Sequence, residues 1–122
     1  MRQLPIHLLI DFIVDDPTLL RHPTPGMAYL REAVLAGGAT VLSEQAHQFE
    51  PGGYTGFLLL AQSHATIHTW PEDELVSIDV FACGTIDPDV IIDHLRRLFR
   101  PRREHVERRE RGDFPPEPVD AP

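Results

Sequence analysis

The chain of 122 residues contains no lysine, and all eleven of its basic residues are arginine. An enzyme that uses pyridoxal phosphate needs a lysine, because the cofactor is held as an imine of the lysine amine. The sequence therefore excludes pyridoxal phosphate as a cofactor. If the protein performs imine chemistry on an amino acid, the carbonyl group has to come from another source.

Cysteine and long apolar runs are also scarce. Cys83 is the only cysteine, which excludes a disulfide within the chain and favours a cytoplasmic location. Taken alone, a single cysteine is most often a small buried apolar residue. No stretch of about 18 apolar residues is present, so a transmembrane helix is not expected. The apolar segment 8–14 contains Asp11 and lacks the flanks of a signal peptide, which favours a strand.

Basic residues are outnumbered by 19 acidic ones, and the net charge is −8. This charge argues against nucleic acid and anionic membranes as partners, and it suits a small cationic substrate. The length predicts a single domain, expected over residues 1–113, followed by a disordered tail at 114–122. A domain of this size is too small to enclose a deep pocket, which favours a site between subunits.

Hydrophobic periodicity predicts a mixed α/β (α+β) fold. Strands are expected at 6–14, 40–49, 56–62, 75–83 and 105–111, with 65–70 continuing in extended form, and helices at 26–36 and 88–99. The order is β-α-β-β-β-α-β. Two helices are too few to cover both faces of a sheet, so we expect a two-layer sandwich with the helices on one face of a mainly antiparallel sheet.

Two further expectations concern this sheet. The continuous apolar run 56–62 (GFLLLAQ) predicts a strand that is buried on both faces. The face without helices carries Phe81 among polar groups, and it is expected to pack against a second subunit. The strand at 105–111 is rich in charge and is expected at an edge of the sheet.

The densest group of chemically capable side chains lies between residues 62 and 72. Strand alternation places His64 and His68 on one side and Ser63 on the other. A serine–histidine hydrolase is one interpretation, but the segment has no G-x-S-x-G motif and no assignable carboxylate partner. A zinc site of His64, His68 and Cys83 is another, although the spacing matches no standard zinc pattern. Taken alone, His68 is equally well interpreted as a structural histidine.

Residues 62–84, QSHATIHTWPEDELVSIDVFACG, closely resemble the processing and catalytic core of bacterial and archaeal S-adenosylmethionine decarboxylases. That family has E-S-H-x-(S/T)-I-H-T-W-P-E, then a turn and a strand that ends F-T-C-G. The segments HLLIDF, GGAT, HQF and ERGDF extend the resemblance, in order, over residues 5–113. The resemblance implies a decarboxylase that supplies decarboxylated S-adenosylmethionine for spermidine, and hence polyamine, biosynthesis.

The resemblance also implies a proenzyme that cuts itself between Gln62 and Ser63. The Ser63 hydroxyl would attack the carbonyl of Gln62, and elimination from the resulting ester would leave a pyruvoyl group at position 63. Residues 1–62 would form the β chain and residues 63–122 the α chain. The pyruvoyl ketone would bind the substrate as a Schiff base and accept the electrons left by carbon dioxide, without pyridoxal phosphate or a metal.

Matched positions imply further roles. His68 and the hydroxyl of Thr55 would manage protons during self-cleavage, and Cys83 would be the proton donor in decarboxylation. Phe49 would stack on the adenine and Glu72 would bind the ribose, although core packing of Phe49 and a solvated turn position of Glu72 stay open. The family's sites lie between two αβ protomers, so the resemblance implies a homodimer in which some residues act in trans.

The sequence departs from the family at three places. Gln62 replaces a glutamate and Thr55 replaces a serine, while Asp73-Glu74-Leu75 replaces two tyrosines around a glycine. The two new carboxylates would favour a substrate with a second positive charge, so a pyruvoyl-dependent ornithine or arginine decarboxylase is an alternative. An uncut paralogue that only binds and regulates a partner is a second alternative.

Overall fold

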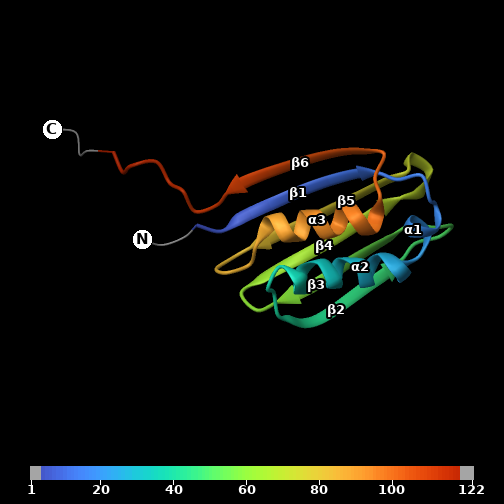
Figure 1. Cartoon of the computed structure of the whole chain (residues 1–122), viewed down its shortest axis with the longest axis horizontal. Coiled ribbons are helices and arrows are strands. Elements are labelled where there is room, and N and C mark those ends of the chain that lie inside the picture. Colours follow the sequence, from blue (N-terminus) through green and yellow to red (C-terminus); the bar gives the residue numbers. More distant parts are fainter. Residues whose placement is uncertain (1–3, 119–122) are drawn as a thin grey trace.

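The computed structural model describes residues 4–118 and shows a six-stranded sheet with helices on one face (Figure 1). The strands are β1 (Ile6–Ile13), β2 (Val41–Gln48), β3 (Tyr54–Leu60), β4 (Ser63–Trp70), β5 (Leu75–Ala82) and β6 (Arg103–Glu110). The helices are α1 (Thr18–Arg21), α2 (Pro23–Ala36) and α3 (Pro88–Phe99), with a short 3-10 helix, η1 (Pro71–Asp73). Neighbouring strands, in the order β2-β3-β4-β5-β1-β6, are all antiparallel. The predicted α+β sandwich is confirmed.

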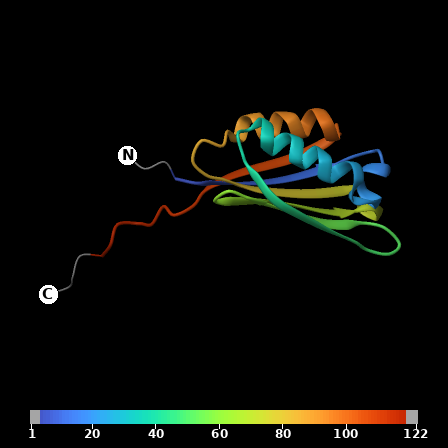
Figure 2. The same ribbon diagram turned by 90° about the horizontal axis from the view of Figure 1, so that it is seen from below.

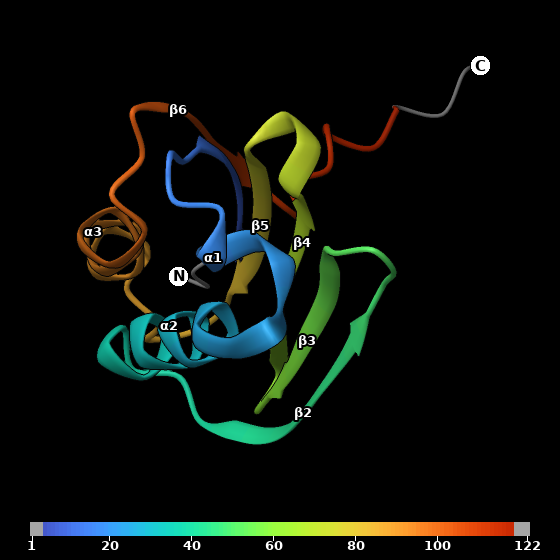
Figure 3. The same ribbon diagram turned by 90° about the vertical axis from the view of Figure 1, so that its right-hand side faces the viewer.

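One face of the sheet is covered and the other is bare. Figures 2 and 3 show α2 and α3 on the same side of the sheet, which we call the helix face. The opposite side is called the open face. The helix face of β5 carries Val76, Ile78, Val80 and Ala82, which are buried as the alternation predicts. The first three of these pack with the apolar sides of the helices into one core.

Helix α3 forms where the sequence predicts it. The Asp87 side chain accepts hydrogen bonds from the backbone N–H groups of Asp89 and Val90, and Pro88 occupies the first turn. Ile91 and Leu95 are buried against the sheet. The helices within residues 4–118 include none long and apolar enough to cross a membrane.

Helix α2 begins three residues earlier than expected. It starts at Pro23 because proline fits the first turn of a helix, where its missing N–H is not needed. Thr24 within it is extended, with φ −100° and ψ 127°, so the regular part of the helix still begins near Gly26.

The strand expected at 56–62 and its extended continuation at 65–70 form two separate strands. β3 and β4 are joined by a hairpin loop of Ala61 and Gln62, and Leu60 pairs with Ser63 across it. The sheet therefore has one strand more than the expected order. The loop contains no glycine, proline or asparagine, so the usual signals of a reversal are missing.

β3 is not buried on both faces, and this expectation is wrong for the single chain. Phe57 and Leu59 are 39% and 42% exposed, because the helices cover only one face and these side chains lie on the other. β6 lies at the edge of the sheet, as its charge predicts. Residues 111–118 form no helix or strand, and residues 119–122 of the expected tail lie outside the described residues.

Candidate functional site

The Gln62–Ser63 peptide bond lies in the hairpin between β3 and β4. Gln62 has a φ of 64°, in the left-handed region, which costs a residue with a Cβ about 1 kcal/mol. Ser63 is the first residue of β4, and alternation points its side chain to the helix face. Its Oγ is buried and has no hydrogen-bond partner within residues 4–118. Buried hydroxyls are normally paired, so this oxygen beside a strained residue is a candidate reacting group.

Cys83 lies at the same end of the sheet. His64 on β4 pairs with Phe81 on β5, so Cys83, two residues beyond Phe81, is level with the hairpin. Alternation places Cys83 on the open face, and the residue is only partly buried. We call this end, with Gln62, Ser63 and Cys83, the cleavage end.

Four other predicted site residues gather at the opposite end of the sheet. Thr55 on β3 pairs with His68 on β4, and Thr55 Oγ1 lies 3.0 Å from His68 Nδ1. A cavity of about 360 Å³ is lined by Phe49, Thr55, His68 and Glu72 together with neighbouring residues. We call this group of four residues and their cavity the pocket end.

Gln48 holds the segment that carries Phe49. Its Nε2 donates to the carbonyl oxygens of Arg21 and Gly53, at 2.6 and 3.3 Å, and its Oε1 lies 2.9 Å from His22 Nδ1. Phe49 is 47% exposed, so the alternative that it fills the core is wrong. Glu72 is exposed in η1 and lines the same cavity.

The two ends do not meet within one chain. Ser63 and His68 are five positions apart on β4, which corresponds to roughly 17 Å at about 3.3 Å per residue. Their side chains also point to opposite faces, as the alternation predicted. A serine–histidine pair of the hydrolase kind is therefore not formed by these two residues of a single chain.

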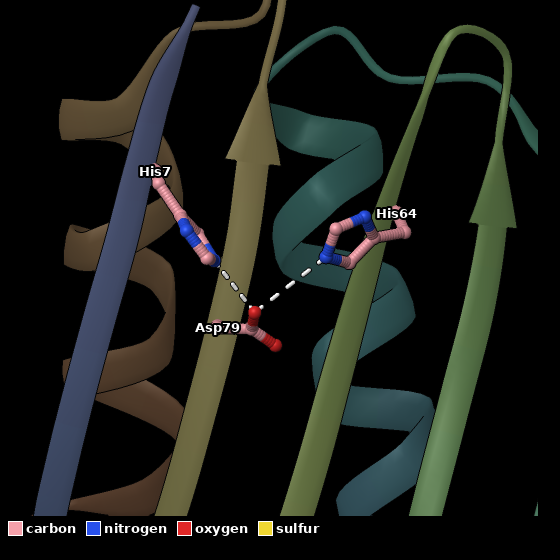
Figure 4. Close-up of side chains that lie close together, drawn as sticks. All are labelled: His7, His64 and Asp79. Carbon is pink, nitrogen blue, oxygen red and sulfur yellow. Dashed lines mark hydrogen bonds and ion pairs between the residues drawn. The ribbon is translucent and has the colours of Figure 1, made fainter. Parts of the chain in front are cut away.

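The zinc site considered from the sequence is not assembled either. His64 and His68 are four positions apart along an extended strand, roughly 13 Å, which is too far for one metal ion. The structure instead groups His64 with His7 on β1 and Asp79 on β5, with one ligand-capable atom of each within 4.8 Å of the others (Figure 4). Sequence analysis missed this group, because His7 and Asp79 are 72 residues apart and belong to no local pattern.

Asp79 is the centre of that group. Its Oδ2 accepts a hydrogen bond from His7 Nε2 at 2.6 Å and lies 3.5 Å from His64 Nε2, while the Thr66 hydroxyl donates to its Oδ1. Burial raises the pKa of Asp79, but the hydrogen bonds from Thr66 and His7 and the nearby imidazoles outweigh it and hold the pKa below its ordinary value. The carboxylate is therefore ionised at neutral pH.

The contact with Arg111 determines which ring nitrogen of His7 carries the proton. Its Nη1 lies 3.3 Å from His7 Nδ1, and a guanidinium can only donate. His7 Nδ1 is therefore the acceptor, which leaves the proton on Nε2 to be donated to Asp79. This arrangement favours a hydrogen-bonded cluster over a metal site, because a metal ion would need the Nε2 lone pair.

The two carboxylates of the 73–75 turn have different surroundings. Glu74 is in the left-handed region and its Oε1 lies 3.0 Å from Nη2 of Arg102, which also binds Asp15. Its charge is thus compensated within the chain. Asp73 is exposed at the tip of the turn.

Comparison with known proteins gives a consistent result. A family model described as S-adenosylmethionine decarboxylase matches residues 6–112. The S-adenosylmethionine decarboxylase proenzyme of Thermotoga petrophila is 35% identical over 115 residues, which cover 93% of this chain and 88% of that protein. The proenzyme of Brevibacillus brevis is 45% identical over 82 residues, 66% of this chain and 62% of its own length. The crystal structure of the adenosylmethionine decarboxylase from Aquifex aeolicus is 32% identical, with a TM-score of 0.82 over 98% of this chain and 100% of that one.

Proposed function

The chain belongs to the S-adenosylmethionine decarboxylase family, and we propose that it decarboxylates S-adenosylmethionine with a pyruvoyl group made from its own Ser63. The product serves spermidine biosynthesis. The observation that carries this proposal is the buried Ser63 hydroxyl, which has no hydrogen-bond partner in the described range 4–118 and directly follows a residue in the left-handed conformation. The relatives are named proenzymes, which agrees with self-processing.

The residues of the hairpin fit the formation of a pyruvoyl group. The Ser63 Oγ attacks the carbonyl carbon of Gln62. The peptide bond then breaks, the Gln62 acyl group becomes an ester of the Ser63 side chain, and the hydroxyl proton passes to the Ser63 nitrogen. The ester then loses the Ser63 α-proton and releases the Gln62 carboxylate, and water converts the remaining enamine to the ketone with loss of ammonia. Only the backbone of Gln62 reacts, so glutamine in place of glutamate leaves the reacting atoms unchanged.

Once formed, the pyruvoyl ketone supplies the carbonyl that binds the substrate amine and takes up the electrons released with carbon dioxide. Cys83 lies on the open face, opposite Gln62 in the register of β4 and β5 and one position beyond the residue opposite Ser63. We assign to its thiol the return of a proton to the substrate α-carbon. This assignment follows from its place at the cleavage end and from the family resemblance.

The pocket end is assigned to substrate binding and to proton handling. The exposed ring of Phe49 offers a face for stacking on the adenine, and the Glu72 carboxylate can accept hydrogen bonds from the ribose hydroxyls. The Thr55 hydroxyl and the His68 imidazole, already hydrogen-bonded to each other, are assigned to proton transfer during self-cleavage.

A second copy of the chain completes the site. The pocket end and the cleavage end are too far apart to act together in one chain, and the open face leaves Phe57 and Leu59 exposed. A two-fold axis across this face would place the pocket end of one copy against the cleavage end of the other, twice in each dimer. We therefore propose a homodimer in which His68 and Thr55 of one copy act on the Gln62–Ser63 peptide bond in the hairpin of the partner copy.

Intact mass spectrometry of the purified protein tests the function. We expect two chains that join at Ser63, the second with a hydrazine-reactive terminus, and release of carbon dioxide from S-adenosylmethionine. A single species of 13.8 kDa that persists on long incubation would leave only the uncut regulatory alternative. Release from ornithine or arginine but not from S-adenosylmethionine would overturn the proposed substrate. Of the two carboxylates that suggested this alternative, Glu74 is bound by Arg102.

A further inference from the structure

The group around Asp79 lies beside the cleavage end but has no part in the mechanism above. Figure 4 shows His7 from β1 and His64 from β4 converging on the Asp79 carboxylate from opposite sides. Thr66, two residues beyond His64, donates to the same carboxylate. One side chain thus joins three neighbouring strands, β1, β5 and β4. We call these four residues the Asp79 cluster.

Aromatic rings hold His64 from both sides. Its ring stacks on Phe81 with centroids 5.8 Å apart and an angle of 19°, and on Phe57 at 6.5 Å and 13°. His7 meets the same Phe81 ring edge-on at 5.6 Å, and the Arg111 guanidinium lies 5.7 Å from the Phe81 ring centroid. The His64 ring therefore lies between two phenyl rings, with its Nε2 3.5 Å from the Asp79 carboxylate.

The Asp79 cluster is next to the reacting residue in the chain. His64 directly follows Ser63 in the chain, and Phe81 precedes Cys83 by two positions on the same face. Among residues 4–118 the Ser63 Oγ has no hydrogen-bond partner, so no hydrogen bond from these residues holds it in place. Its position therefore depends on the backbone at residues 63 and 64, and the side chain of His64 lies against the cluster on the open face.

We propose that Asp79 is a positioning residue for self-cleavage, which holds the Ser63 hydroxyl against the carbonyl carbon of Gln62 by fixing His64. This inference rests on the proposed function, because it concerns the same Ser63. Asp79 itself does not touch the reacting atoms. The geometric demand is strict, since a displacement of about 1 Å lowers the rate of a positioned reaction by about a hundredfold.

The test uses full-length chain made by cell-free translation, so that cleavage is followed from the uncut state on denaturing gels. Asp79→Asn keeps the shape of the side chain but loses the charge that the two imidazoles face. We expect it to slow cleavage at least about tenfold, the size expected when a charge-assisted hydrogen bond is lost. The matched control is Asp11→Asn, because Asp11 also lies on the open face and accepts a hydrogen bond from Ser77 at 2.7 Å. The control is expected to cut within about twofold of wild type.

Hydroxylamine distinguishes positioning from a later chemical role. It cleaves esters much faster than amides, so it releases residues 1–62 as soon as the Ser63 ester exists. If Asp79 positions the attack, the variant forms little ester and hydroxylamine leaves its cleavage slow. Recovery of the wild-type rate with hydroxylamine would place Asp79 in the elimination step and overturn the inference, as would a variant that cuts within about twofold of wild type.

Two further measurements keep the outcome clear. If circular dichroism shows that Asp79→Asn does not fold, His7→Gln replaces it, since this change removes one partner and leaves the carboxylate; we expect cleavage about threefold slower, and an unchanged rate would contradict the inference. A wild-type chain that never cuts in the same system would refute the proposed function itself. The two failures are therefore distinguishable.

Discussion

The cleavage end and the pocket end lie on the same sheet, yet their side chains are held in different ways. At the pocket end, Thr55 is hydrogen-bonded to His68 and the segment of Phe49 is anchored by Gln48. At the cleavage end, the Ser63 Oγ has no partner in the described part of the chain and Gln62 is strained. The hydrogen bonds of the pocket end are already formed in the single chain, whereas the cleavage end has the features that we propose lead to a covalent change. Four predictions test this difference.

The largest effect is expected from separating the two ends on different chains. Ser63→Ala and His68→Ala should each abolish decarboxylation, because one lacks the pyruvoyl precursor and the other the proton-transfer partner. If the two variants are co-expressed in equal amounts, half of the dimers contain one copy of each. Each mixed dimer has one complete site out of two, so about a quarter of the wild-type activity should return. The measurement is carbon dioxide release from the co-purified protein.

The control for this experiment pairs two changes at the same end. Ser63→Ala combined in trans with Cys83→Ala should regain no activity, because both residues belong to the same cleavage end. Equal recovery from both pairs, or none from either, would contradict the assignment of the two ends to different copies.

The next largest effect concerns the preformed hydrogen bond of the pocket end. Thr55→Val keeps the shape of the side chain but removes the hydroxyl that lies 3.0 Å from His68 Nδ1, and it should slow self-cleavage about a hundredfold. Thr55→Ser keeps the hydroxyl and should cut at close to the wild-type rate. A gel time course measures both. Fast cutting by the valine variant would remove Thr55 from the proposed machinery.

A smaller effect is expected for the carboxylates of the 72–74 segment. Glu72→Gln should raise the KM for S-adenosylmethionine about tenfold and change kcat less, because a hydrogen bond to a charged group is lost on binding. Glu74→Gln should leave the KM within about twofold, since that carboxylate binds Arg102 rather than the cavity. The reverse order of the two KM values would show that Glu74 faces the substrate.

The smallest effect is on stability and depends on pH. The pKa of Asp79 is lower in the folded chain than its unfolded value of about 3.9, so the ionised carboxylate stabilises the fold at pH values above about 3.9. This contribution disappears as the pH falls through the folded pKa. Asp79→Asn should therefore lower the free energy of unfolding by about 1 kcal/mol at pH 6, with a difference that shrinks below pH 4. Urea unfolding of both proteins in the uncut Ser63→Ala background measures it. A difference that grows on acidification would contradict the lowered pKa.

The part of the fold that follows local rules was predictable from the sequence. The alternation of β5 and the Asp87-Pro88 start of α3 are confirmed, because periodicity and capping act over a few neighbouring residues. The β3–β4 hairpin was not predicted, since Gln62 enters the left-handed region without the turn residues that usually signal it. Gln62, whose left-handed conformation made the turn hard to predict, also contributes the carbonyl of the bond that we propose is cleaved.

The candidate site was predictable only where the family motif names the residues. The gathering of Thr55, His68, Phe49 and Glu72 around one cavity agrees with the implied roles, which stay predictions until they are tested. The Asp79 cluster could not be predicted, because strand pairing alone brings His7 next to Asp79. Which residues would act in trans in the proposed dimer also depends on the sheet order rather than on spacing along the chain.

The sheet order determines what a cut between residues 62 and 63 does to the protein. β1, β2 and β3 belong to the first fragment and β4, β5 and β6 to the second, so the order β2-β3-β4-β5-β1-β6 interleaves them. β1 is inserted between β5 and β6, and β3 remains paired with β4. Dissociation would have to break three ladders of backbone hydrogen bonds at once. The two fragments of a chain cut there would therefore stay together, and the cut would interrupt only the two-residue loop between β3 and β4.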